Sequence, residues 1–158
     1  MKLKKDINDL YIKKGDLCDS CDSFEDGKRC LTCDQLCELC VDVCPNRANV
    51  SITVESDLFS ESHQIVHIDG MCNECGNCGV FCPHTGNPYK DKITVFWTLE
   101  DFEDSTNKGF LMISNTEFNV RTDDKKIVHY TIGEDSISPH MKLMIDTVIS
   151  KYNYYLNN

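Results

Sequence analysis

The sequence lacks several features that define common functional classes. No apolar stretch approaches the roughly 18–20 residues that a membrane-spanning helix needs. The segment Met1–Leu10 has no apolar core and no small-residue cleavage site, so no secretory signal peptide is expected. A nucleophile elbow, a glycine-rich phosphate loop and a paired-carboxylate arrangement are also missing. These absences predict a cytoplasmic protein with no membrane partner, and they indicate no substrate site of its own.

Basic residues are scarce as well. The 158 residues contain 26 acidic side chains against 16 lysines and arginines, which gives a formal net charge of −10. The phosphates of a nucleic acid would repel such a chain, so no nucleic-acid partner is expected. An acidic surface suits a carrier that docks on a basic partner, and it also keeps a protein soluble.

Cysteine, by contrast, is abundant, with eleven residues in the chain. Such a content is typical either of a disulfide-linked secreted module or of a metal protein in a reducing compartment. The odd number, the dense Cys-x2-Cys spacing and the lack of a signal peptide favour the metal protein.

Most of these cysteines fall into two runs that each end in Cys-Pro. The runs are Cys33-x3-Cys37-x2-Cys40-x3-Cys44-Pro45 and Cys72-x2-Cys75-x2-Cys78-x3-Cys82-Pro83. The second run matches the bacterial ferredoxin pattern for a [4Fe–4S] cluster. Three thiolates spaced two residues apart can surround one face of the cluster, and the fourth points away. In two-cluster ferredoxins this fourth cysteine binds the other cluster.

This crossed arrangement predicts two [4Fe–4S] clusters that each take ligands from both runs. The ligands of cluster 1 are Cys33, Cys37, Cys40 and Cys82, and those of cluster 2 are Cys72, Cys75, Cys78 and Cys44. The additional residue between Cys33 and Cys37 departs from the pattern. A bulge in the loop can accommodate it, or Cys30 can replace Cys33 as the ligand.

Three cysteines, Cys18, Cys21 and Cys30, are left over from this assignment. Together with Cys33 they have the spacing of a four-thiolate zinc or rubredoxin-like site, but using Cys33 there would leave one cluster short of a ligand. An additional metal site with a non-cysteine ligand, pairing with a partner subunit, and free thiols are the other readings. A zinc-binding structural or interaction module is therefore the alternative function.

The surroundings of the two runs differ in ways that predict different reduction potentials. The second run contains glycines that let main-chain N–H groups approach the cluster sulfurs, which raises the potential. These glycines are Gly70, Gly76 and Gly79. The first run instead has carboxylates near its ligands, at Asp34, Glu38 and Asp42. Negative charge lowers a potential, so cluster 1 is predicted to be the low-potential cluster.

The runs lie in a predicted α+β fold with three parts. Residues 1–30 form a cysteine-containing extension, residues 31–98 a bacterial two-cluster ferredoxin-like domain, and residues 99–158 a β-meander and helix. In the middle part, each run predicts a loop, a short helical turn and a strand. Alternating residues at 50–54 and 63–68 predict an inserted β-hairpin, and residues 92–98 predict a strand buried on both faces.

The last part contains no cysteine, and its pattern is different. Residues 110–113, 118–122 and 127–132 predict an antiparallel meander, with residues 123–126 as its second turn. Ser138 and Pro139 predict the N-cap and first residue of a helix. Its apolar positions recur at helical spacing and are predicted to form a stripe that faces the meander. They are Met141, Ile145, Val148, Ile149, Tyr152 and Leu156.

Several segments carry a family resemblance. They are Arg29–Cys33, Cys40–Asn49, Met71–Pro83, Gly86–Lys92 and Ser105–Phe110. Over roughly residues 28–150 the chain resembles the C-terminal iron–sulfur region of the selenate reductase subunit family. Those large proteins also have a flavin-binding part that is similar to the small subunit of glutamate synthase and to dihydropyrimidine dehydrogenase.

The resemblance implies an electron relay through two [4Fe–4S] clusters. Electrons would pass between a flavin that NAD(P)H reduces and a terminal reductase or dehydrogenase, including molybdenum-dependent enzymes. The expected partners are thus a flavoprotein and a molybdoenzyme subunit. The chain has no flavin or nucleotide portion, which predicts a split subunit or a separated domain. Selenate itself has no support in these residues, and purine or other molybdoenzyme catabolism in an anaerobe is equally compatible.

Overall fold

The computed structural model describes residues 37–59 and 62–156. Cys18, Cys21, Cys30 and Cys33 lie outside these described residues, as does the whole predicted extension at 1–30. Of the predicted cluster ligands, the three remaining cysteines of the first run and all four of the second can be located.

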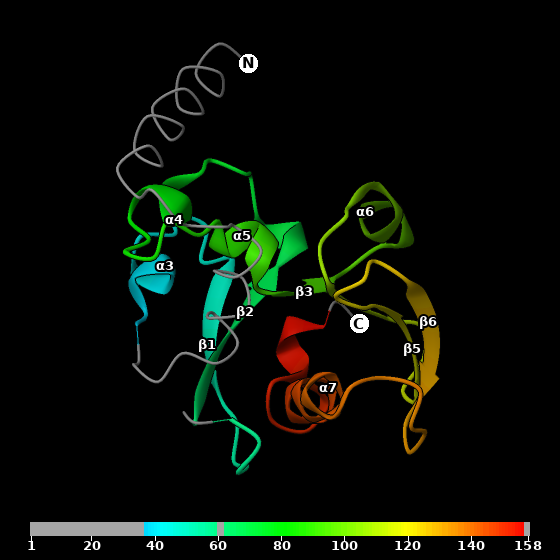
Figure 1. The fold of residues 1–158 in the computed structure, drawn as a ribbon. Helices are drawn as coiled ribbons and strands as arrows, with labels where there is room; N and C mark the ends of the chain where they lie inside the picture. Colours follow the sequence, from blue (N-terminus) through cyan, green and yellow to red (C-terminus); the bar gives the residue numbers. More distant parts are fainter. Residues whose placement is uncertain (1–36, 60–61, 157–158) are drawn as a thin grey trace.

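A six-stranded mixed sheet organises the described chain, and its strands are neighbours in sequence order (Figure 1). The strands are β1 (Asn49–Thr53), β2 (His63–Ile68), β3 (Ile93–Phe96), β4 (Gly109–Met112), β5 (Glu117–Arg121) and β6 (Ile127–Thr131). The pairs β1–β2, β4–β5 and β5–β6 are antiparallel, whereas β3 is parallel to both β2 and β4. The predicted hairpin and the predicted meander are therefore both confirmed.

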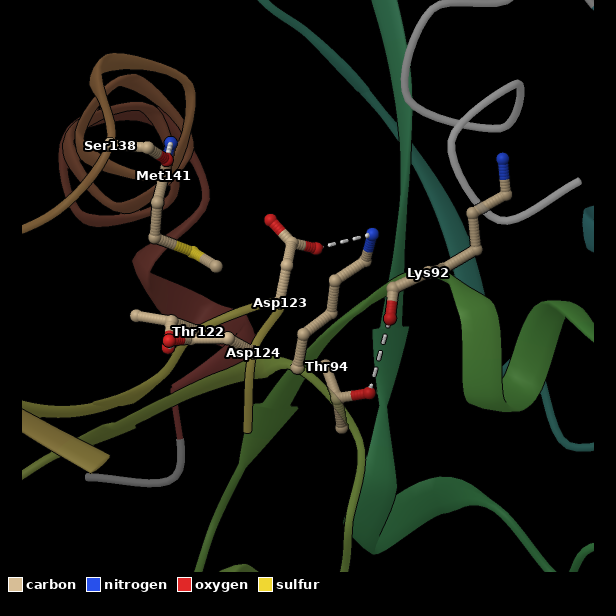
Figure 2. Close-up of polar contacts among 8 residues, drawn as sticks. Lys92, Thr94, Thr122, Asp123, Asp124, Ser138 and Met141 are labelled. Carbon is tan, nitrogen blue, oxygen red and sulfur yellow. Dashed lines mark hydrogen bonds and ion pairs between the residues drawn. The ribbon is translucent and has the colours of Figure 1, made fainter. Parts of the chain in front are cut away.

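The turn between β5 and β6 also forms where it was predicted. The Thr122 amide donates to the Lys126 carbonyl at 3.0 Å, and Lys125 takes a left-handed φ of 61°. Nearby, the Lys108 ammonium pairs with the Asp123 carboxylate at 3.1 Å. Figure 2 shows this turn beside Thr94 of β3, whose hydroxyl donates to the Lys92 carbonyl at 3.4 Å.

Strand β3 links the two halves of the sheet. All of its residues are buried, as predicted, but the strand is shorter than the predicted segment at 92–98, because Trp97 is only partly buried and Thr98 is exposed. Helix α6 (Leu99–Asp104) then connects it to β4. A Cβ atom on Gly109 would lie only 2.0 Å from the Thr94 carbonyl oxygen, so glycine permits the close approach of β4 to β3. The boundary predicted between residues 98 and 99 falls at the start of α6, and the division into domains stays a prediction.

Helix α7 (Pro139–Lys151) covers one face of the sheet. The Ser138 hydroxyl caps the helix by accepting from the Met141 amide at 3.3 Å, which confirms the predicted N-cap (Figure 2). The apolar stripe packs against strands of both halves of the sheet, not against the meander alone. The prediction was wrong at the end of the stripe. Helix α7 stops at Lys151, and the short helix η2 (Asn153–Tyr155) brings Leu156 into the core.

The other face of the sheet carries a different set of elements. Val95 packs into the core beneath α7, whereas the next residue, Phe96, packs with Phe102 of α6 and Leu111. Side chains alternate along a strand, so α6 and α7 lie on opposite faces. The helical turns α3 (Leu39–Asp42), α4 (Asn77–Val80) and α5 (Pro88–Asp91) gather at one end of the β1–β2 hairpin (Figure 1).

Candidate metal centre

The two cysteine runs adopt the same local structure. In the first, the Asp42 amide donates to the Glu38 carbonyl at 3.0 Å and so closes the turn α3. In the second, the Val80 amide donates to the Gly76 carbonyl at 3.1 Å and closes α4. The predicted helical turn before each Cys-Pro is thus confirmed.

The repeat continues beyond the Cys-Pro dipeptides. The Arg47 amide donates to the Cys44 carbonyl at 3.1 Å, and the Thr85 amide donates to the Cys82 carbonyl at 3.3 Å. Arg47 and Thr85 both have left-handed backbones, with φ of 54° and 58°. Two residues of different type share this uncommon conformation at equivalent positions. The sequence repeat is therefore a structural repeat.

The runs differ at the residue that precedes each turn. Gly76 has a φ of 81°, a conformation that a Cβ atom would strain. Its counterpart Glu38 has a φ of −102° and needs no glycine. Gly76 therefore serves the geometry of this turn.

One recess brings cysteines of both runs together. Its wall contains Cys44 of the first run and three cysteines of the second, Cys72, Cys75 and Cys78. These four residues are the predicted ligands of cluster 2. Burial is the main cause that raises the pKa of Cys72 and of Cys78, and the nearby Cys44 thiol adds to the rise in both.

Main-chain and side-chain N–H groups are directed at the sulfurs of this recess. The Ala48 amide donates to Cys44 Sγ at 3.2 Å, and the Glu74 amide donates to Cys72 Sγ at 3.2 Å. Cys78 receives two such hydrogen bonds, from the main-chain amide of Tyr89 and from the Asn49 side chain, whereas the Gly79 amide donates to the Gly76 carbonyl at 3.0 Å. Donors of this kind stabilise a thiolate.

Burial opposes these donors in the metal-free thiols. It is the largest cause that raises the pKa of Cys72, to about 11, and it raises the pKa of Cys78 as well. A bare thiolate is therefore unfavourable in the recess, and a bound cation would compensate its charge.

The described ligands of cluster 1 lie around α3 and α4. Cys40 is buried and packs with Cys78 and Ile65, so the two runs are in contact there. Cys37 and Cys82 are partly exposed. Cys33 falls outside the described residues, so the structure shows no complete ligand set for this cluster.

Within residues 37–59 and 62–156, no three Cys, His, Asp or Glu side chains converge closely enough to hold a single metal ion. The ligands of a [4Fe–4S] cluster each bind a different iron, so their sulfurs lie farther apart than the ligands of one ion. The recess with its four thiols and its N–H donors fits that more open arrangement.

A polar cavity of about 310 Å³ adjoins the recess and shares several of its lining residues. The shared residues are His67, Cys72, Glu74 and Tyr89. Burial lowers the pKa of His67 to about 4, so this histidine is neutral. Burial, followed by the nearby charges of Asp101 and Glu74, raises the pKa of Asp69 to about 6.

Sequence reasoning missed several residues of the site, and three of them, Asn49, His67 and Tyr89, matter for its chemistry. Two of them could have been found, because the alternation of the hairpin places Asn49 and His67 on one face of the strands that flank the cysteine runs. Tyr89 contributes a main-chain amide, and its side-chain type gives no signal for that.

The part of the chain that the structure describes contains no helix with the length and apolar character needed to cross a membrane. No family model matches the chain, and no solved structure matches it.

Two curated proteins of Escherichia coli are similar to the chain, and both are named "Putative oxidoreductase YgfK". The protein of strain O157:H7 is 40% identical over 161 aligned residues, which cover 94% of this chain and 15% of that protein. The protein of strain K12 is 51% identical over 112 residues, which cover 66% of this chain and 11% of that protein. The chain is therefore related to proteins named as oxidoreductases and spans only a small part of their length.

Proposed function

We propose that the chain is the electron-relay portion of an oxidoreductase and holds two [4Fe–4S] clusters. Cys44, Cys72, Cys75 and Cys78 would bind cluster 2. Cluster 1 would be held by Cys37, Cys40 and Cys82, with Cys33 as its fourth ligand.

The observation that carries this proposal is the entry of Cys44 into the recess formed by the second run. A ferredoxin-type spacing predicts that the cysteine before the first proline serves the cluster of the other run. The convergence of these four thiols, on a backbone that repeats between the runs, supports the prediction. A cluster bound there would accept and release one electron at a time.

The described residues supply what such a group needs. The Ala48, Glu74 and Tyr89 amides donate to ligand sulfurs, which stabilises negative charge at the site. Burial of Cys78 and of the neighbouring Cys40 limits contact with water. The chain thus tunes and shields the centre, while the electron chemistry belongs to the cofactor.

The relatives support an oxidoreductase role, since both are named as oxidoreductases and are several times longer than this chain. We infer that the chain works beside a flavoprotein that uses NAD(P)H and a terminal reductase or dehydrogenase, including molybdenum-dependent ones. These partners would be separate subunits or other parts of a longer protein.

Anaerobically purified protein should contain iron, acid-labile sulfide and little zinc. About eight irons per chain with matching sulfide are expected for two [4Fe–4S] clusters. Negligible sulfide with stoichiometric zinc, persisting after reconstitution, would exclude the proposal and leave the zinc-binding structural module as the function.

A further inference from the structure

Asn49 occupies a central place between the two cysteine runs. It opens β1 directly after the first run, and only 1% of its surface is exposed. Across the hairpin it is paired in register with His67, which is equally buried. A buried polar side chain requires hydrogen-bond partners, so the contacts of Asn49 define its role.

The Asn49 amide makes contacts with both runs. Its Nδ2 atom donates to the Cys40 carbonyl oxygen at 3.0 Å, which fixes the turn of the first run. The side chain also lines the recess together with Cys78, whose neighbour Cys40 packs against it, and there it is a hydrogen-bond donor to the Cys78 sulfur. Its Oδ1 atom lies 2.9 Å from His67 Nδ1.

These contacts determine the orientation of the amide and the tautomer of the histidine. Only Nδ2 can donate, so its two hydrogens go to the Cys40 carbonyl and the Cys78 sulfur. Oδ1 must then accept, which places a proton on His67 Nδ1. His67 therefore holds Asn49 in the orientation that presents its N–H to the sulfur.

We propose that Asn49 is a positioning residue that raises the reduction potential of cluster 2 and joins that cluster's site to the first run. This inference rests on the proposed iron–sulfur function. The N–H donated to Cys78 stabilises the added negative charge of the reduced state, so its loss makes reduction harder. His67 acts indirectly, because it hydrogen-bonds to Asn49 and so orients the amide that donates to Cys78.

The test compares the wild-type chain with Asn49→Asp and Asn49→Ser in anaerobic redox titrations followed by EPR. Both substitutions remove the N–H donor, and aspartate keeps the size and the acceptor for His67. We expect the ratio of reduced to oxidised cluster 2 at a fixed potential to fall about tenfold, equivalent to about 59 mV for a one-electron couple. Cluster 1 should change less, because its contact is with the Cys40 main chain.

A matched control lies elsewhere in the same sheet. Asn119 and His129 are also cross-strand partners, with Oδ1 and Nδ1 3.3 Å apart, but this pair is exposed and is on the β5–β6 hairpin. Asn119→Asp should leave both potentials unchanged. It introduces the same change of charge without a cysteine contact.

The outcomes separate this inference from the proposed function. Wild-type protein without iron and sulfide would refute the function itself. Two clusters whose potentials do not respond to either Asn49 substitution would refute the inference alone. Loss of both clusters from both variants, while Asn119→Asp retains them, would show a purely structural role and would also overturn the tuning role.

Discussion

Burial raises the pKa of the Cys72 thiol, and the thiol of Cys44 lies close enough to add to that rise, although the two cysteines belong to different runs. The α3 and α4 turns produce this contact by placing the runs against each other at the end of the β1–β2 hairpin. If each run supplies its last cysteine to the cluster of the other run, each cluster depends on both runs. Several measurements can establish how far this dependence extends.

Replacing Cys44 should damage the cluster of the other run. In Cys44→Ser we expect iron to fall from about eight to about four per chain, with loss of the EPR signal of cluster 2. Cys82→Ser is the matched variant and should remove cluster 1 instead. Loss of cluster 1 in Cys44→Ser and of cluster 2 in Cys82→Ser would show instead that each run supplies all four ligands of its own cluster.

The two clusters should differ in potential. Glu38 precedes α3 in the first run at the position where the second run has Gly76. Its carboxylate should disfavour reduction of cluster 1, so Glu38→Gln should raise that potential and leave cluster 2 nearly unchanged. Redox titration monitored by EPR provides the measurement, and Glu117→Gln in β5 is a distant control. A single potential shared by both clusters in the wild type would contradict the prediction.

Gly109→Ala should strongly destabilise the sheet. A Cβ atom there would lie 2.0 Å from a main-chain oxygen of β3, and relief of that clash requires the strands to separate. We expect a loss of about 3 kcal/mol in the free energy of unfolding, measured by anaerobic urea denaturation. In Gly133→Ala the new methyl group meets nothing within 4 Å, so only the strain of its φ of 99° remains, about 1–2 kcal/mol. Equal losses in the two variants would show that β3 and β4 adapt easily.

Arg121 should anchor α6 to the sheet. Its side chain is 5% exposed, donates to the Phe102 and Asn107 carbonyls, and stacks 4.2 Å from the centre of the Phe102 ring. Arg121→Met leaves two carbonyls without this donor, and we expect the protein to lose about 2 kcal/mol of stability. The exposed Lys126→Met is the control and should change stability little. A tolerated Arg121→Met would mean that ring packing alone holds α6.

The sequence predicted local structure well where turns and alternation are strong. The hairpin of β1 and β2, the meander and the Ser138 cap all follow from patterns within a few residues. The parallel pairing of β3 with β4 did not follow from the sequence, because it depends on a crossover through α6 and on the close approach at Gly109. The end of α7 was also missed, since Tyr152 and Leu156 keep helical spacing although the backbone changes after Lys151.

In the candidate site, too, the sequence predicted local features and not the contacts between distant segments. The four thiols that line the recess are those that the cysteine spacing assigns to cluster 2, and their role as ligands stays a prediction. The donors around the thiols could not be predicted in this way. Asn49 reaches Cys78 only because the hairpin folds it between the runs, and Tyr89 acts through a main-chain amide that every residue except proline carries.

The main hydrophobic core and the predicted ligands lie in different parts of the sheet. Among the residues that the structure describes, the core beneath α7 contains no cysteine, whereas the described predicted ligands belong to turns at the end of the hairpin. A newly made chain could therefore complete its main hydrophobic core before any iron arrives. Cofactor assembly would then act on a scaffold that already exists, and loss of the metal in air would leave a compact protein ready to be repaired.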